Sequence, residues 1–410
     1  MDIPGLPARR AALRLLDAVL RRGETLDQAA HNALQGIVSG PDRALAKALA
    51  AEALRWLADL DALIDSATRQ PLPEDAKART VLRIMLAGWL RLETPPHAVI
   101  ATGLPLLAGG PRRLAHGVFS TLSRAGAKLP DAPTLPSGAA ARWGERAGLI
   151  AGALAVPPPL DLTLRDPAET ALWCERLGGR SLMPGHVRLP RGDMVENLPG
   201  FDEGAWWVQD LAASLPARLL GSGEGRRVLD LCAAPGGKTL QLAAAGWQVT
   251  ALDASAHRLR RVEQNLARTG LAATLVTADA LDWTTDEPFD AVLLDAPCTA
   301  TGTCRRHADV LHRIGPKAIA EMADLQARLL ARAVDCLAPG GRLVYAVCSL
   351  ESAEGEGQTA QIMLPVDPID ADELPEGLTP TPQGWLRTDP AMLAEAGGLD
   401  GFFVARWRKA

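Results

Sequence analysis

Residues 228–239 read VLDLCAAPGGKT. The first four, Val228–Leu231, form a short apolar run that is typical of a buried strand, and a helix is expected to begin at Lys238. Alanine, proline and glycine fill the turn between them, so a ligand can lie close to the backbone there. The first N–H groups of a helix have no partner within the helix and can bind such a ligand. The pattern therefore predicts a nucleotide-type binding turn.

Three ligands compete for a turn of this kind. A phosphate-binding P-loop requires G-x-x-x-x-G-K-[ST], and Cys232 occupies its first glycine position although Gly237-Lys238-Thr239 fits the end. A dinucleotide fingerprint requires G-x-G-x-x-G, which is absent. S-adenosylmethionine is the third ligand. Asp253 ends the next apolar run, where a carboxylate can bind both ribose hydroxyls, and Asp279 ends the one after it, near the adenine. We therefore expect S-adenosylmethionine as the cofactor.

Strand-like and helix-like segments alternate after Arg226. Two helical patterns, Ser255–Thr269 and Lys317–Leu337, separate short apolar runs. This alternation predicts βαβ units and a parallel sheet covered on both faces, as in a Rossmann-like α/β domain. The end of the chain adds a closing pair of strands, Gly384–Arg387 and Phe402–Trp407. The other expected strands are Val228–Leu231, Gln248–Leu252, Ala273–Thr277, Ala291–Leu294 and Arg342–Ala346.

The first third of the chain has a helical pattern throughout. Apolar residues recur at spacings of three and four from Pro7 to about Ala125, and Gly/Pro breaks separate six expected helices. Prolines at 130, 133 and 136 indicate an extended linker. We predict four segments, which are an all-α domain (1–128), a Pro-rich linker (129–141), a small α+β connector (142–225) and the α/β domain (226–410).

Composition limits the class of protein. Of 410 residues, 48% are hydrophobic and 22% are charged, which is ordinary for a globular protein and argues against disorder. No apolar run reaches the roughly 18 residues of a membrane span, and the N-terminal pattern is not that of a signal peptide. We expect a cytoplasmic protein. Six cysteines without a CxxC pair indicate buried or reactive thiols rather than a disulfide framework.

Charge is unevenly distributed along the chain. The net charge is −5, but residues 1–128 hold 17 Lys+Arg and 12 Asp+Glu, whereas the remainder holds 26 and 36. A basic N-terminal segment on an acidic body suggests that the first part meets phosphate while the second holds a small ligand.

Two cysteines are expected at one edge of the sheet. Cys298 follows a strand within Asp295-Ala296-Pro297-Cys298, and Cys348 follows the strand Arg342–Ala346. A thiolate that adds to C6 of cytosine makes C5 able to attack a methyl sulfonium. A carboxyl group near N3 stabilises the addition, and a second acid/base group can assist loss of the C5 proton and expulsion of the thiol. Two thiols and an aspartate are sufficient for that cycle.

Cys232–Thr239, Asp295–Gly302 and Val344–Leu350 resemble the motifs of the RNA 5-methylcytosine methyltransferases of the NOL1/NOP2/sun class. The resemblance implies that Cys348 attacks C6, that Cys298 assists breakdown of the adduct, and that Asp295 steadies the base and borders the cofactor. We also expect Lys238 to anchor the active site through Asp295, the alternative being a lysine that simply begins a helix. The cofactor-binding positions implied by the resemblance are Cys232, Ala233, Ala234, Pro235, Gly236, Gly237, Lys238, Asp253, Arg258, Asp279 and Asp295.

The resemblance extends to the rest of the chain. The helical N-terminus is similar to the NusB-like RNA-binding domain that precedes the catalytic domain in bacterial 16S rRNA enzymes of this class, and the segment ending Trp206–Asp210 is similar to their connector. It implies an RNA partner, most simply 16S rRNA, and a monomer without a metal or a membrane. Two alternatives stay open. One is a tRNA or 23S rRNA target, and the other is an RNA-binding assembly factor with a vestigial site.

Several other residues have simpler interpretations. A zinc site is not expected, because no standard zinc finger has the spacing of Cys298, Cys304, His307 and His312. Arg305, Arg306 and His307 are interpreted as phosphate or base contacts, although a solvated basic turn is about equally consistent with the sequence. Trp206 and Trp207 are expected in the core rather than as a base-stacking platform.

Overall fold

The computed structural model describes residues 3–192 and 194–410, which form two compact units. The first unit comprises the residues up to Val156 together with the segment Cys304–Ile314, and the second comprises Pro157–Thr303 and Gly315–Ala410. The chain therefore leaves the second unit after Thr303 and returns to it at Gly315.

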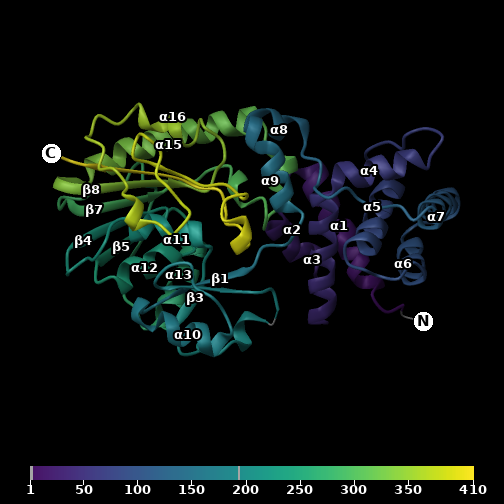
Figure 1. The fold of residues 1–410 in the computed structure, drawn as a ribbon, viewed down its shortest axis with the longest axis horizontal. Coiled ribbons are helices and arrows are strands. Elements are labelled where there is room, and N and C mark those ends of the chain that lie inside the picture. The colour runs from purple at the N-terminus through teal and green to yellow at the C-terminus, as the bar shows by residue number, and fades with distance from the viewer. Residues whose placement is uncertain (1–2, 193) are drawn as a thin grey trace. The chain divides into compact units, whose positions relative to one another are not determined.

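The first unit is helical, as expected. Helix α5 lies at its centre, because α1, α3, α4, α6 and α7 all contact it (Figure 1). Every residue of α5 from Ala78 to Gly88 is buried. Two of these are arginines, and Arg83 forms a two-pronged ion pair with Asp61 of α4, with nitrogen–oxygen distances of 2.7 Å. The helices are α1 (Leu6–Arg22), α2 (Leu26–Ala33), α3 (Gly40–Arg55), α4 (Leu57–Ser66), α5 (Lys77–Leu90), α6 (Pro96–Gly103) and α7 (Gly109–Arg124).

The number of helices corrects the sequence prediction. Seven α-helices, not six, occupy the described residues before Ala125. The chain turns between α3 and α4 at Trp56, which ends one helix and begins the next without a glycine or a proline. A break of that kind leaves no Gly/Pro signal, so the sequence pattern merges the two helices. The predicted linker 129–141 also differs, because helix α8 (Ser137–Trp143) begins inside it.

A segment from far along the chain completes this unit. Ala308 is fully buried in the core formed by α1, α3 and α5. Arg55 donates a hydrogen bond of 2.9 Å to the carbonyl of Arg305, and a ring nitrogen of His312 lies 2.7 Å from the carbonyl oxygen of Leu54. Arg305 itself is buried, so both sequence interpretations, a phosphate or base contact and a solvated basic turn, are wrong for this residue. Helices α9 (Ala147–Leu154) and α14 (Val310–Arg313) belong to the same unit.

The second unit is built on a seven-stranded sheet in the order β6-β5-β4-β7-β8-β10-β9. The first five strands are parallel, while β10 is antiparallel to both β8 and β9. The parallel sheet and the closing pair confirm the Rossmann-like prediction. The bounds are β4 (Arg227–Leu231), β5 (Gln248–Asp253), β6 (Thr274–Thr277), β7 (Phe289–Asp295), β8 (Leu337–Val347), β9 (Leu386–Arg387) and β10 (Phe403–Arg408).

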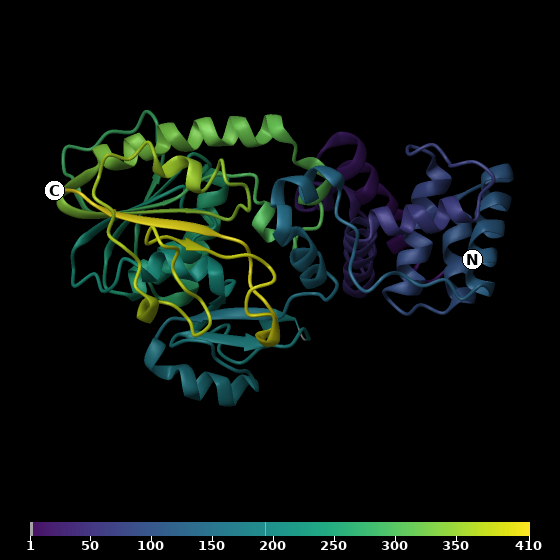
Figure 2. The same ribbon diagram turned by 45° about the horizontal axis from the view of Figure 1, so that its top comes forward.

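Helices cover both faces of this sheet, because side chains alternate along each strand. Val228 faces a core shared with α11 (Leu211–Arg218) and α12 (Gly237–Ala244), whereas its neighbour Leu229 faces a core shared with α15 (Pro316–Asp335). Figure 2 shows α15, in bright green, along one face of the sheet. Helix α13 (Ala256–Thr269) packs beside α12.

A smaller antiparallel sheet, in the order β2-β1-β3, precedes the large one in the chain. Its core contains Trp173 and Trp206, and Trp207 is also buried. The expectation that Trp206 and Trp207 are core residues is therefore confirmed. A buried Asp161 accepts two hydrogen bonds of 2.7 Å from Arg188. The elements are β1 (Leu160–Leu164), α10 (Thr170–Leu177), β2 (His186–Leu189) and β3 (Trp206–Val208).

The strand order determines where a ligand can bind. From β4 the chain builds outward through β5 and β6 on one side, and then returns to place β7 on the other side of β4. In open parallel sheets a crevice forms at the carboxyl ends of the strands where the direction of winding reverses. That reversal point brings the turn after β4 beside the end of β7.

Candidate active site

The turn after β4 is held open by its own backbone and by one carboxylate. Cys232 has a left-handed φ of 61° and Gly236 one of 103°, where an added Cβ would also lie 3.0 Å from Val262. Asp253, at the end of β5, is fully buried and accepts hydrogen bonds from the N–H of Ala234 (3.2 Å) and from the guanidinium of Arg258 (2.8 Å). The sequence-predicted positions thus contact one another, with Arg258 exposed over the buried Asp253.

Two further groups fix the start of α12. Thr239 donates a hydrogen bond of 2.6 Å to Asp230, and burial raises the pKa of this carboxyl to about 7. The other oxygen of Asp230 has no hydrogen-bond partner among the described residues.

Burial likewise raises the pKa of the Cys232 thiol to about 12, with nearby carboxylates adding to the effect. Cys232 therefore stays protonated at neutral pH, which argues against a nucleophilic role.

Lys238 and Asp295 form an ion pair across the reversal point of the sheet. The Lys238 Nζ lies 2.6 Å from Asp295 Oδ2, and it also lies 5.4 Å from the centre of the Phe402 ring. Lys238 is 8% exposed, so its ammonium group depends on this carboxylate. Asp295 ends β7 and retains partial exposure. The pair joins the cofactor-type turn to the Asp-Ala-Pro-Cys motif.

The sulfurs of Cys298 and Cys348 lie 3.4 Å apart. Adjacent parallel strands β7 and β8 bring them together, since Asp295 is paired with Ala346 and each cysteine follows within three residues. The hydrogen bond to Cys348, with burial second, raises the pKa of Cys298 well above its usual value. Either sulfur can be the donor in this contact.

A buried carboxylate that the sequence analysis missed lies behind the two thiols. Glu354 is fully buried and accepts a hydrogen bond from the N–H of Thr299 (2.9 Å) and another from the hydroxyl of Ser349 (2.9 Å). These two residues directly follow the two cysteines. Nothing in the sequence distinguishes Glu354 from the neighbouring acids Glu351 and Glu356.

A cavity of about 600 Å³ lies beside the turn. The ion pair Lys238–Asp295 forms part of its wall, as do Ala233, Pro235 and Gly237 of the turn. Residues of α13 and of the segment around β3 complete it, and they include Trp207, Gln209, Arg261, Gln264, Asn265 and Arg268.

Comparison with known proteins decides the family. A model described as "16S rRNA methyltransferase RsmB/F" matches residues 217–408, and the NusB family model matches residues 6–106. Ribosomal RNA small subunit methyltransferase B of Xylella fastidiosa is 35% identical, with 98% of each chain covered. The protein of that name from Xanthomonas campestris is 37% identical over 86% of this chain and 87% of its own. This chain belongs to the RsmB/F family of 16S rRNA methyltransferases.

The fold comparison agrees with this assignment. The crystal structure of PH0851 superposes with a TM-score of 0.74 and covers the whole of both chains, at 21% identity, which shows the shared fold. Membership of the RsmB/F family makes the chain an S-adenosylmethionine-dependent RNA methyltransferase with a NusB-type N-terminal domain. The resemblance drawn from the three motifs is thereby confirmed at the level of the family.

The residues at the turn suit the cofactor of this RsmB/F enzyme. The turn carries only small side chains, and its residue Pro235 is exposed. Asp253 and Asp279 lie at the carboxyl ends of neighbouring strands β5 and β6. Asp279 is exposed, and one of its oxygens accepts the N–H of Leu281 at 2.9 Å. When bound, S-adenosylmethionine supplies the electrophilic methyl group.

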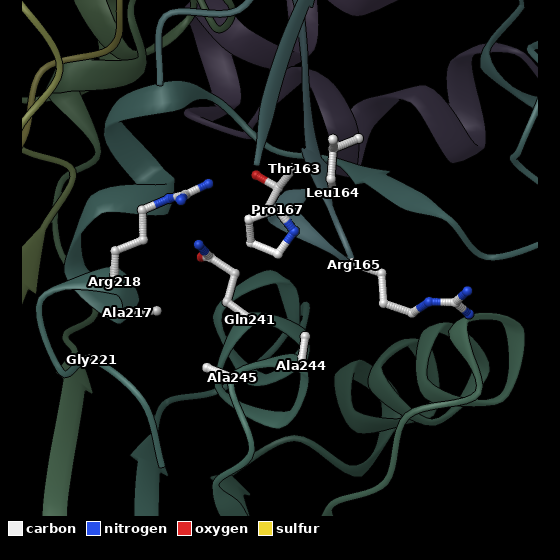
Figure 3. Close-up of a pocket in the computed structure, with 10 residues that line it drawn as sticks. All are labelled: Thr163, Leu164, Arg165, Pro167, Ala217, Arg218, Gly221, Gln241, Ala244 and Ala245. Atoms are coloured by element: carbon white, nitrogen blue, oxygen red, sulfur yellow. The ribbon is translucent and has the colours of Figure 1, made fainter. Parts of the chain in front are cut away.

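Other features of the RsmB/F chain lie outside this site. A second cavity, of about 240 Å³, lies between β1 and helices α11 and α12 (Figure 3). Thr163 and Arg218 line it, and burial lowers the pKa of Arg218 to about 10. None of the sequence-predicted site residues lines this cavity.

Within residues 3–192 and 194–410 no three His, Cys, Asp or Glu side chains are grouped to hold a metal ion. No helix in the same ranges combines the length and apolarity needed to cross a membrane.

Proposed function

We propose that this enzyme methylates C5 of a cytosine in 16S rRNA through a covalent adduct in which Cys348 is bonded to C6. The observation that carries the proposal is the 3.4 Å contact between the sulfurs of Cys298 and Cys348 next to the Lys238–Asp295 pair. Two thiols at this distance can contact one pyrimidine ring. A single buried cysteine would not support the same chemistry, because most such residues only fill space.

The proposed sequence of steps assigns one task to each side chain. The Cys348 thiolate, stabilised by the Cys298 S–H group, forms a bond to C6, and the electron pair of the C5=C6 bond moves toward C5 and N3. Asp295, held by Lys238, accepts a hydrogen bond from the exocyclic amino group and keeps the ring in place. Bound S-adenosylmethionine would supply the methyl group to C5 and leave as S-adenosylhomocysteine. The C5 proton then passes to water, the C5=C6 bond re-forms, and Cys348 departs as a thiolate. Cys298 assists this last step.

We also propose where the ligands bind. The turn Cys232–Lys238, with Asp253, Arg258 and Asp279, holds S-adenosylmethionine, and Asp295 borders both the cofactor and the cytosine. The 600 Å³ cavity takes the RNA strand next to the target base, because Arg261 and Arg268 provide cations beside the active-site ion pair. The basic helical unit binds another part of the same RNA, outside the segment that carries the target cytosine.

Trapping of the adduct tests the chemistry. Replacement of Cys298 by alanine should leave the Cys348–C6 bond able to form but slow to break, so a protein–RNA species stable to denaturing gel electrophoresis should accumulate. The double variant C298A/C348A is the control and should give no such species. No adduct with C298A, or an adduct in the double variant, contradicts the assignment.

Mapping of methylated positions tests the target. Cytosine 967 of 16S rRNA is the proposed site. Bisulfite sequencing of RNA from a deletion strain should show loss of one 16S rRNA signal, and its return on complementation with the wild-type gene. Loss in tRNA or 23S rRNA instead would move the target, and no loss at all would favour an assembly role. A monomeric state and a cytoplasmic location complete the proposal.

A further inference from the structure

The side chain of Glu354 connects the two loops that carry the cysteines. One oxygen, Oε2, accepts the N–H of Thr299 and the side-chain amide of Gln326, both at 2.9 Å. The other, Oε1, accepts the hydroxyls of Thr299 and of Ser349. Thr299 follows Cys298 on the loop after β7, and Ser349 follows Cys348 on the loop after β8. A single carboxylate thus contacts the residue next to each thiol.

Burial of the Glu354 carboxylate raises the free energy of the folded protein unless all of its hydrogen bonds form. The side chain is fully buried, and no ion pair of Glu354 with a cation is found among the described residues. The nearby Arg387 is instead paired with Glu356 at 2.6 Å. A buried carboxylate without a cation is tolerated only when donors satisfy its lone pairs. Four donors do so here, and they come from both loops and from α15.

Further contacts hold the same two loops in one position. The Thr301 hydroxyl accepts the N–H of Leu350 at 3.0 Å, and the N–H of Gly302 donates to the carbonyl of Cys348, also at 3.0 Å. A side chain is excluded at Gly302, because an added Cβ would lie 1.9 Å from the carbonyl oxygen of Gly401. The backbone of Glu354 is fixed as well, since Tyr345 of β8 donates to its carbonyl at 2.6 Å. The backbone that carries the Glu354 carboxylate is therefore held in place.

We infer that Glu354 is a positioning residue of the active site, which holds the loops after β7 and β8 so that the sulfurs of Cys298 and Cys348 stay in contact. The inference rests on the proposed two-thiol mechanism. Glu354 is fully buried behind these loops, so we do not assign it a contact with the substrate. Its negative charge is also one of the influences that keep Cys298 protonated, after the hydrogen bond to Cys348 and burial.

Two substitutions separate shape from charge. In Glu354→Gln the amide oxygen can still accept from the two N–H donors, while the amide N–H₂ faces hydroxyls of Thr299 and Ser349 that can turn to accept. Glu354→Ala removes all four contacts. The matched control is Ser352→Ala, because Ser352 is exposed on the same loop.

The first measurement is steady-state methylation over a range of RNA concentrations and pH values. We expect E354A to lower kcat about a hundredfold with KM for RNA changed less than threefold, E354Q to keep at least a tenth of kcat with a shifted pH profile, and S352A to match the wild type. A folded E354A enzyme with wild-type kcat overturns the inference, as does E354Q that is as slow as E354A and has an unshifted profile.

The second measurement needs no RNA. Diamide, a thiol oxidant, removes two electrons and two protons from the thiol pair and is itself reduced to the hydrazine, so the rate of Cys298–Cys348 disulfide formation reports how often the sulfurs meet. Mass spectrometry should show this disulfide forming at least tenfold more slowly in E354A than in the wild type and S352A. Equal rates overturn the inference. Failure of the C298A trap with this rate difference intact would reject the proposed chemistry and keep the positioning role.

Discussion

Asp295 of β7 lies opposite Ala346 of β8 in the parallel pairing of the two strands. This register sets the spacing of the active site, because Cys298 and Cys348 leave the sheet three and two residues later. It also directs Asp295 toward Lys238 at the start of α12. Neighbouring strand ends thus bring together a thiol pair and an ion pair that are far apart in the sequence.

Replacement of Cys348 by alanine should abolish methyl transfer without loss of the cofactor site. Cys348 lies on the loop after β8, whereas the proposed cofactor contacts come from the turn after β4 and from the ends of β5 and β6. Calorimetric titration with S-adenosylhomocysteine should give a Kd within about twofold of the wild type, while methyl transfer from a radiolabelled donor falls to background. Residual turnover by C348A would remove Cys348 as the nucleophile.

The ion pair Lys238–Asp295 should behave as one unit. Lys238→Met retains the length of the side chain but leaves Asp295 without its cation, and Asp295→Asn leaves a nearly buried ammonium without an anion. We expect each single variant to lower kcat about a hundredfold and the double variant to be little slower than either. If the losses of kcat in the two single variants instead add up in the double variant, the two residues act independently. Circular dichroism melts of all three variants provide the control for folding.

The thiol pair could be predicted from the sequence, but its support could not. Both cysteines follow short apolar runs that the strand–helix alternation identifies as parallel strands, so their common edge follows from parallel pairing. Glu354 lies in a polar loop, Ser349–Glu354, where its burial depends on donors from Thr299 and Gln326, which are distant in the chain. The burial of Arg305 could not be predicted for the same reason, since its segment contacts Arg55, which lies 250 residues earlier in the chain.

Asp230 should make stability depend on pH. Its pKa is raised from the model-peptide value of 3.8 to about 7, chiefly by burial, so its contribution to stability is complete below pH 4 and is lost as the pH rises through 7. Asp230→Asn removes this titration. Between pH 4.5 and 8, the unfolding free energy of D230N relative to the wild type should rise by at most about 4 kcal/mol. Chemical unfolding of both proteins at four pH values measures it, and a constant difference would contradict the raised pKa.

Arg261 should contribute to RNA affinity through the 600 Å³ cavity, whereas its neighbour Arg260 should not. Both are exposed on α13, but only Arg261 lines the cavity. We expect Arg261→Ala to raise the Kd for substrate RNA and to reduce the slope of log Kd against log salt by about one, with kcat at saturating RNA unchanged. Arg260→Ala is the matched control. Equal effects of the two variants would show only a general loss of charge.

The helical unit should contribute to RNA binding through exposed cations, and point variants test this better than truncation. Deletion of residues 1–128 would remove the helices that bury Ala308 and Arg305, so the segment Cys304–Ile314 would lose its packing partners. Loss of activity would then be uninformative, because that segment directly follows the loop of Cys298. Arg112 and Arg113 are exposed on α7. The variant R112A/R113A should weaken RNA binding and reduce the salt slope by about two, with the melting temperature unchanged. An unchanged slope would show that these two arginines do not contact RNA phosphate.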